Sequence, residues 1–119
     1  MYHYSLIIPC YNEAENLPKL FSKFSNSFKR NKVEVIFVNN GSADKTKELL
    51  TDFSKKVEHV KVVNVKKNIG YGNGILKGLE KSSGNFIGWT HADLQTDPED
   101  FITAIELIKN HKDKKLIVK

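Results

Sequence analysis

The stretch HADLQTDP, residues 91–98, concentrates side chains that can bind a metal ion. His91, Asp93 and Gln95 alternate along the chain, so a locally extended backbone would point all three to the same side. Their nitrogen and oxygen donors form a partial shell for Mn²⁺ or Mg²⁺, which diphosphate oxygens would complete. An ordinary polar turn is the alternative, with Asp97 capping a helix that begins at Pro98.

Two further motifs carry groups that can bind a nucleoside. In PCYNE, residues 9–13, the ring of Tyr11 can stack on a base and the carboxylate of Glu13 can accept a hydrogen bond from a ribose or base donor. In VNNGSADKT, residues 38–46, the amide oxygen of Asn40 can accept a hydrogen bond from the ring N–H of uracil or guanine. Each motif also has a purely structural interpretation, as a turn that leads into a capped helix.

The structural interpretation names particular caps. Asn12 forms a capping box with Glu15 before the first helix, and Ser42 or Asp44 caps the second. A fourth segment, NIGYGNG at 68–74, resembles a dinucleotide-binding fingerprint, but counting from Gly70 places an isoleucine where the third glycine belongs. Its glycines fit a turn or a close approach of the backbone to a ligand.

Strands and helices that alternate along the chain position these motifs. Short β-branched runs predict strands at 4–8, 33–38, 60–65 and 85–90, and a fifth strand begins at 116–119. Apolar residues spaced by three and four predict helices over 17–28, 49–57, 75–79 and 101–108. This alternation predicts an α/β fold with a mostly parallel sheet and flanking helices. All four motifs then lie along the edge formed by the carboxyl ends of the strands, where such folds bind ligands.

Composition narrows the class of protein. The 119 residues suit one domain, 1–119, and no apolar run reaches the roughly 18 to 20 residues of a membrane span. The net charge of +5 comes from scattered lysines with a single arginine, which argues against a nucleic-acid partner. The lone Cys10 and the lack of a signal peptide predict a cytoplasmic protein. Because the chain stops in a predicted strand, we expect it to be truncated at its C-terminus and to expose apolar surface that favours a homo-oligomer.

Taken together and in this order, the motifs resemble those of family 2 inverting glycosyltransferases with the GT-A fold, a Rossmann-like nucleotide-binding fold. The similarity extends to the dolichyl and polyprenyl phosphate sugar synthases of that family, through PCYNE, VNNGSADKT, NIGYGNGILKGLEKSSGNFIGW and HADLQTDP. It spans nearly the whole chain. The resemblance implies a nucleotide-sugar donor, a divalent metal cofactor, and a polyprenyl phosphate or a glycan or lipid hydroxyl as acceptor, at the inner membrane face.

The resemblance also implies roles for residues. It places Pro9, Tyr11, Glu13, Val38 and Asn40 around the nucleoside, and it places His91, Asp93 and Gln95 around the metal and diphosphate. No catalytic base is assigned, because the family's acceptor-binding part would follow residue 119.

The sequence departs from the family pattern at two places. The family's paired aspartates are Asn39 and Asn40 here, which keeps an acceptor oxygen but loses the charge. The first aspartate of the metal motif is His91, which binds Mn²⁺ through a neutral imidazole and is a poor ligand for Mg²⁺. These departures favour the alternative of a non-catalytic nucleotide-sugar-binding fragment or decayed homologue. A ligand-free α/β scaffold is a third interpretation.

Overall fold

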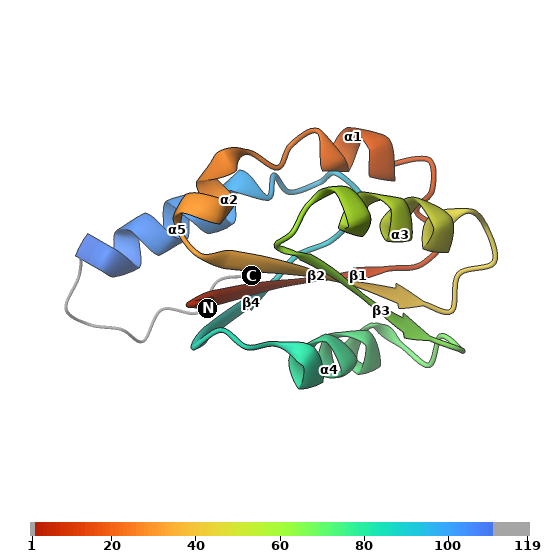
Figure 1. Ribbon diagram of the computed structural model, residues 1–119. Coiled ribbons are helices and arrows are strands. Elements are labelled where there is room, and N and C mark those ends of the chain that lie inside the picture. Colours follow the sequence, from red (N-terminus) through yellow and green to blue (C-terminus); the bar gives the residue numbers. More distant parts are fainter. Residues whose placement is uncertain (1, 111–119) are drawn as a thin grey trace.

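Four parallel strands form the centre of the protein, seen in a computed structural model that describes residues 2–110 (Figure 1). Their order across the sheet is β3–β2–β1–β4. The strands are β1 (Tyr4–Cys10), β2 (Val33–Asn40), β3 (Val60–Val65) and β4 (Phe86–Trp89). The predicted parallel α/β fold is confirmed, whereas the predicted strand at 116–119 lies outside the described residues.

The two central strands are buried along their whole length. Every residue of β1 and β2 is buried, whereas β3 and β4 at the sheet edges are partly exposed. Parallel strands covered by helices on both faces need apolar side chains on both sides, so their sequences are nearly continuous apolar runs.

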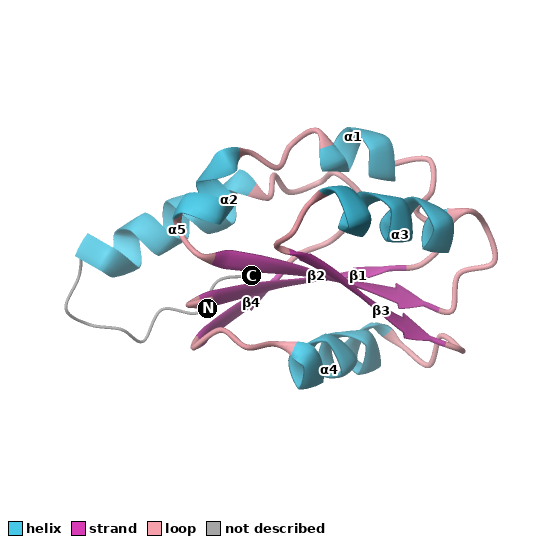
Figure 2. Cartoon of the chain, in the orientation of Figure 1, coloured by secondary structure: helices cyan, strands magenta, loops and turns pink. Residues whose placement is uncertain are grey.

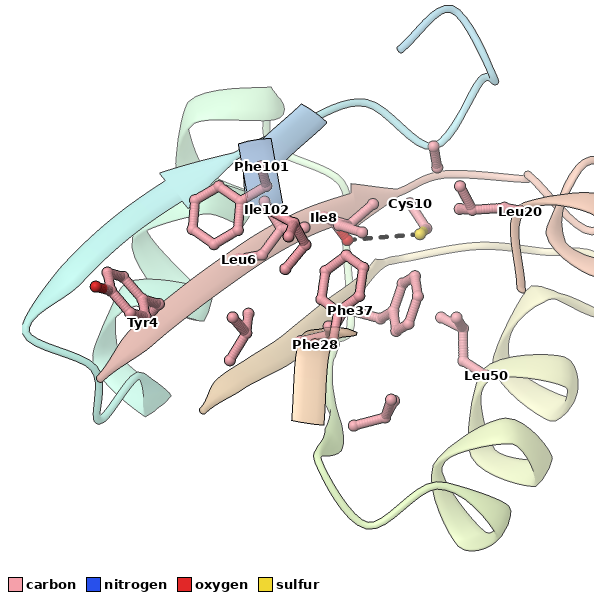
Figure 3. Packing of buried hydrophobic residues seen from close by; sticks show 14 of the residues in the cluster. Tyr4, Leu6, Ile8, Cys10, Leu20, Phe28, Phe37, Leu50, Phe101 and Ile102 are labelled. Atoms are coloured by element: carbon pink, nitrogen blue, oxygen red, sulfur yellow. Dashed lines mark hydrogen bonds between the residues drawn. The ribbon is translucent and has the colours of Figure 1, made fainter. Parts of the chain in front are cut away.

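Helices cover the two faces of this sheet unequally (Figures 1 and 2). One face carries α1 (Leu17–Phe21), α2 (Asn26–Arg30), α3 (Thr46–Lys56) and α5 (Glu99–Asn110), and the other carries only α4 (Tyr71–Lys81). Figure 3 shows the larger core on the four-helix face, where Phe28, Leu50 and Phe101 pack against the sheet. None of the helices described within residues 2–110 has the length and apolarity to cross a bilayer.

The single helix predicted over 17–28 is wrong, because the chain forms two short helices there. Ser22 donates its hydroxyl to the Lys19 carbonyl, and Ser25 has an extended backbone and caps α2 by accepting from the Ser27 N–H. These local bonds compete with a continuous helix. The apolar residues of both short helices still pack into one core, in which the rings of Phe21 and Phe53 stack with centroids 4.0 Å apart.

The predicted helix caps have mixed outcomes. Asp97 accepts the Glu99 N–H at 2.9 Å at the start of α5. The N-cap of α3 is Lys45 and neither Ser42 nor Asp44, although Asp44, one residue earlier, accepts the Thr46 N–H at 2.9 Å. The capping box at Asn12 is wrong: its φ of 52° is left-handed, and its side chain bonds to another loop. Tertiary contacts thus take precedence over the local motif at this position.

A buried carboxylate anchors the chain between α4 and β4. Glu34 on β2 is fully buried and accepts hydrogen bonds from the Ser5 hydroxyl and the Ser83 backbone N–H, both at 2.6 Å. The Lys61 ammonium lies 2.6 Å from its other oxygen. Burial raises the pKa of Glu34, but the bonds from Lys61, Ser5 and Ser83 outweigh that effect and the net pKa lies below its ordinary value.

Two glycines allow α4 to lie close to the sheet. A Cβ added at Gly78 would lie 2.6 Å from Ile7 Cγ2 and 3.1 Å from Val38 Cγ2. One at Gly74 would lie 3.2 Å from Asn40 Nδ2. Glycine at these positions therefore brings the start of α4 to the carboxyl ends of β1 and β2.

We expect Gly78→Ala to lower the free energy of unfolding by about 1–3 kcal/mol, because the added methyl group overpacks the contact with Ile7. The matched control is Gly72→Ala in the same helix, where an added Cβ meets no atom within 4 Å. That control should be neutral or stabilising by up to about 1 kcal/mol. Urea denaturation measures both variants, and equal stability of the two would contradict the described packing of α4.

Candidate functional site

The four loops that carry the predicted motifs lie at one end of the sheet, because all four strands are parallel (Figure 2). The end of β1 diverges from β4 at this edge. The ladder between them stops at the pair Ile7–Trp89, two residues before Pro9. Pro9 has no backbone N–H with which to continue a ladder. A pocket lies at this divergence, which is also where the strand order reverses, and such switch points are where open α/β sheets bind ligands.

The pocket has a volume of about 160 Å³ and is lined by residues from all four predicted motifs. Its lining residues are Pro9, Cys10, Tyr11, Glu13, Asn40, Asn68, Tyr71, His91, Ala92 and Asp93. Six residues predicted from the sequence therefore come together: Pro9, Tyr11, Glu13, Asn40, His91 and Asp93. Two others, Val38 and Gln95, are not among the lining residues.

Hydrogen bonds join the loop after β1 to the loop after β2. The backbone N–H of Asn12 donates to Ser42 Oγ at 3.0 Å, and the N–H of Ala43 donates to Asn12 Oδ1 at 2.8 Å. The left-handed φ of Asn12 makes this exchange possible, and asparagine tolerates that conformation better than most residues. Tyr11, half exposed at 50%, is thereby held at the mouth of the pocket.

Asp44 and Thr46 extend this junction. Asp44 Oδ2 accepts from the Ala14 N–H at 3.3 Å, and Thr46 Oγ1 accepts from the Glu13 N–H at 2.9 Å. Desolvation raises the pKa of Asp44, but hydrogen bonds from Thr46 and Ala14 outweigh it and the pKa lies below the ordinary value. The Gly-Ser-x-Asp part of the second motif is therefore structural, because it fixes the loop that carries Tyr11 and Glu13.

The two consecutive asparagines at the end of β2 have different roles. Both polar side-chain atoms of Asn39 have a partner: its Nδ2 donates to Asn64 Oδ1 at 3.0 Å and its Oδ1 accepts from the Ser42 N–H at 3.3 Å. Asn40 lines the pocket and is only 3% exposed, and its Nδ2 donates to Asn68 Oδ1 and to the Gly70 carbonyl. Its Oδ1 is buried and has no hydrogen-bond partner among the described residues. An acceptor left in this state is available to a ligand donor.

Two buried residues near the pocket have packing roles. Val38 is completely buried beneath α4 beside Ile7 and Ile36, and its contact with a nucleoside stays a prediction. Cys10 is buried as the sequence predicts, and its thiol contacts the Ile8 carbonyl at 3.5 Å (Figure 3). Burial, and secondly the charge of Glu13, raise the pKa of the Cys10 thiol far above its ordinary value, so it is not a nucleophile.

The loop after β4 is bent and not extended as predicted. Leu94 has a left-handed φ of 69°, and Asp93 Oδ1 accepts from the Gln95 N–H at 3.2 Å across the bend. The alternation of side chains is lost there, so His91 and Asp93 reach the pocket and Gln95 does not line it. The role of Gln95 as a metal ligand stays a prediction.

An aromatic stack orders the same corner. The rings of Tyr71 and His91 lie parallel within 20° with centroids 5.0 Å apart. Burial, and secondly the charge of Asp93, raise the pKa of Tyr71, so its hydroxyl is neutral at neutral pH. Stacking restrains the plane of the imidazole.

The donor set fits a divalent ion held jointly by protein and ligand. Across residues 2–110 no group of three or more His, Cys, Asp and Glu side chains is arranged to hold a metal by itself. His91 and Asp93 supply one nitrogen and one carboxylate to the pocket, a combination that suits Mn²⁺ when ligand oxygens complete the shell.

Sequence reasoning assigned no ligand role to four residues that line the pocket: Cys10, Asn68, Tyr71 and Ala92. Asn68 and Tyr71 belong to the glycine-rich segment after β3, which was expected at the ligand edge without any residue being assigned a role. The signal was available in part, since the amide of Asn68 and the ring of Tyr71 follow a predicted strand at that edge. Their partners Asn40 and His91 come from distant parts of the chain and become neighbours only in the fold.

Comparison with known proteins identifies the family. The sequence model described as Glycosyl transferase family 2 matches residues 5–118. A dolichol-phosphate mannosyltransferase of Pyrococcus furiosus is 38% identical over 109 residues, which is 92% of this chain and 31% of the relative. An undecaprenyl-phosphate 4-deoxy-4-formamido-L-arabinose transferase of Yersinia enterocolitica is 35% identical over 92% of this chain and 34% of its own length. The chain thus spans about a third of these relatives.

Solved structures agree with the fold. S. aureus TarS 1–349 in complex with UDP-GlcNAc superposes with a TM-score of 0.75 at 23% identity, over 92% of this chain and 32% of that one. A mannosyltransferase of Pyrobaculum calidifontis in complex with GDP-Man and Mn²⁺ gives 0.73 at 21% identity, over 91% and 33%. At this level of identity the likeness establishes the GT-A, Rossmann-like fold alone.

We expect Asp44→Ala to lower the free energy of unfolding by about 1 kcal/mol at pH 7, because it removes the acceptor of the Thr46 and Ala14 backbone N–H groups. Because the folded pKa of Asp44 is lowered, its contribution is present above the ordinary carboxylate pKa and is lost as pH falls through the folded pKa. The difference from the parent should therefore shrink on acidification. Urea denaturation between about pH 7 and pH 3 measures it, with Asp52→Ala, exposed on α3, as the control. A difference that is constant with pH would exclude the carboxylate charge as its source.

Proposed function

The chain belongs to glycosyltransferase family 2, and on that premise we propose that it forms the nucleotide-sugar-binding part of an inverting glycosyltransferase. The donor is a UDP- or GDP-sugar. The acceptor is polyprenyl phosphate, whose oxygen is already anionic and needs no catalytic base, or else a glycan or lipid hydroxyl. Relatives named as dolichol-phosphate and undecaprenyl-phosphate transferases support the first acceptor, which would bring the protein to a membrane surface.

The buried, unpartnered Oδ1 of Asn40 is the observation that carries this proposal. Leaving a buried acceptor without a partner costs about 1–3 kcal/mol, so its position in a pocket points to a ligand that donates an N–H. Tyr11, exposed at the mouth of the same pocket, offers a surface on which a base can stack. Pro9 and Glu13 complete the wall beside it.

The diphosphate lies on the opposite side of the pocket in this proposal. His91 and Asp93, which both line the pocket, would hold a divalent ion there, and the family resemblance assigns Gln95 to the same shell. When bound, the ion would supply charge neutralisation for the departing diphosphate. The protein positions the donor and excludes water, with Tyr71 restraining His91. Solved relatives of this fold that hold GDP-Man with Mn²⁺ and UDP-GlcNAc support such a donor site.

A non-catalytic nucleotide-sugar-binding module is the second candidate. It is favoured by the neutral pair Asn39 and Asn40 and by His91, which replace the family's carboxylates. The two candidates share the donor site and differ only in turnover. Transfer of labelled sugar to polyprenyl phosphate by the protein distinguishes them, since only the enzyme forms product.

We expect Asn40→Leu to weaken UDP or GDP binding by about 1–3 kcal/mol, because the base N–H is left without its acceptor. Isothermal titration calorimetry measures the affinity. Asn64→Ala is the control, because it removes a similar amide contact from Asn39, which does not line the pocket. A leucine variant that binds as well as the parent would place the base elsewhere.

We expect the affinity of the parent for a nucleotide sugar to depend on Mn²⁺. In Asp93→Ala the affinity should be the same with and without Mn²⁺, because the metal site is lost. Titrations with Mn²⁺ and with EDTA should differ for the parent and for the control Asp52→Ala, and they should coincide for Asp93→Ala. His91→Asp, which restores the family's carboxylate, should allow Mg²⁺ to replace Mn²⁺, because Mg²⁺ prefers oxygen ligands. Equal affinity of the parent with and without metal would remove the metal site from the proposal.

A further inference from the structure

We infer that Asn68 is a positioning residue which fixes the amide of Asn40 so that the pocket selects bases with a ring N–H beside a carbonyl. This inference rests on the proposed nucleotide site and goes beyond it, because it concerns which nucleotides are rejected. Uracil and guanine have the required edge. Cytosine and adenine present an unprotonated ring nitrogen beside an exocyclic amine.

The orientation of an asparagine amide follows from its hydrogen-bond partners. Both partners of Asn40 Nδ2 are acceptors: Asn68 Oδ1 at 3.1 Å and the Gly70 carbonyl oxygen at 3.2 Å. Turning the amide over would set its oxygen against these two oxygens. The Oδ1 of Asn40 is therefore held as the polar atom that remains for a ligand.

Asn68 is itself oriented by the backbone. Its Oδ1 accepts from the Gly70 N–H at 2.9 Å as well as from Asn40. A backbone N–H cannot become an acceptor, so the polarity is set at Gly70 and passes through Asn68 to Asn40. Gly70 supplies both its N–H and its carbonyl to this arrangement at a φ of 116°, a conformation that glycine adopts readily.

The same arrangement leaves Asn68 with a donor. Its Nδ2 makes no hydrogen bond to another residue in the range 2–110, and Asn68 is exposed and lines the pocket. The pocket therefore offers an acceptor from Asn40 and a donor from Asn68. A base that places an N–H next to a carbonyl complements this pair. Cytosine and adenine would set an acceptor against Asn40 Oδ1 and a donor against Asn68 Nδ2.

The test measures the affinities of UDP, CDP, GDP and ADP by calorimetry in Mn²⁺, for the parent and three variants. UDP and CDP share ribose and diphosphate, so the ratio of their dissociation constants isolates the base edge. The parent should bind UDP on the order of ten- to a hundredfold more tightly than CDP, as expected when a buried polar group is left unpaired. The parent should likewise bind GDP more tightly than ADP.

Two variants of Asn68 separate its contributions. Asn68→Ala removes one of the two acceptors that hold the Asn40 amide and leaves only the Gly70 carbonyl. The ratio of CDP to UDP dissociation constants should therefore fall toward one, in part because CDP binds more tightly than it does to the parent. Asn68→Asp keeps the acceptor that orients Asn40 but removes the donor, so UDP should weaken while CDP does not improve. Asn64→Ala is the matched control, since it breaks the equivalent amide pair with Asn39 outside the pocket and should keep the parent ratio.

Three other outcomes would each overturn a defined part of this inference. An unchanged ratio in Asn68→Ala, with melting temperatures showing that the variant is folded, would overturn the positioning role. Equal binding of UDP and CDP by the parent would overturn the selection of base while leaving the nucleotide site intact. Failure of all four nucleotides to bind would overturn the proposed function, and this inference with it.

Discussion

The parallel pairing of β1 with β2 is the contact on which the rest of the structure depends. Seven consecutive residue pairs, from Tyr4–Val33 to Cys10–Asn39, lie in register at the centre of the sheet. Because the strands run in the same direction, the loops that follow them leave at the same edge. The Asn12 N–H donates to Ser42 Oγ and the Ala43 N–H donates to Asn12 Oδ1, and these bonds join the two loops. The wall of the pocket is a consequence of this pairing.

Neutral amides take the place of carboxylates at that edge, and the network explains why they suit it. An aspartate at position 40 would put oxygens against Asn68 Oδ1 and the Gly70 carbonyl, which both accept from Asn40 now. Two buried carboxylates side by side would also repel. The charge that the sheet does bury, on Glu34, lies at its opposite end and is matched by Lys61. The residues at the end of β2 therefore rely on directed hydrogen bonds.

The elements of the fold were largely predictable from local pattern. Residues in β1 to β4 and the helical spacing in α3, α4 and α5 follow from apolar periodicity, which reports which face of an element is buried. Prediction failed where side chains bond to the backbone of their own loop or of another loop. Serines such as Ser25 divide the first predicted helix, and Asn12 bonds to the loop after β2. Periodicity carries no information about such contacts.

By itself the sequence determined the order of elements, the family and most of the residues around the pocket, because these depend on residue type and on the rule that parallel strands end together. Only the tertiary structure decided which polar atoms are bonded within the protein and which have no partner. It tied Asn39 to Asn64, left Asn40 Oδ1 without a partner, and turned the chain at Leu94 so that Gln95 leaves the pocket. These outcomes depend on distances between residues far apart in the chain and on individual backbone angles, which no local pattern specifies.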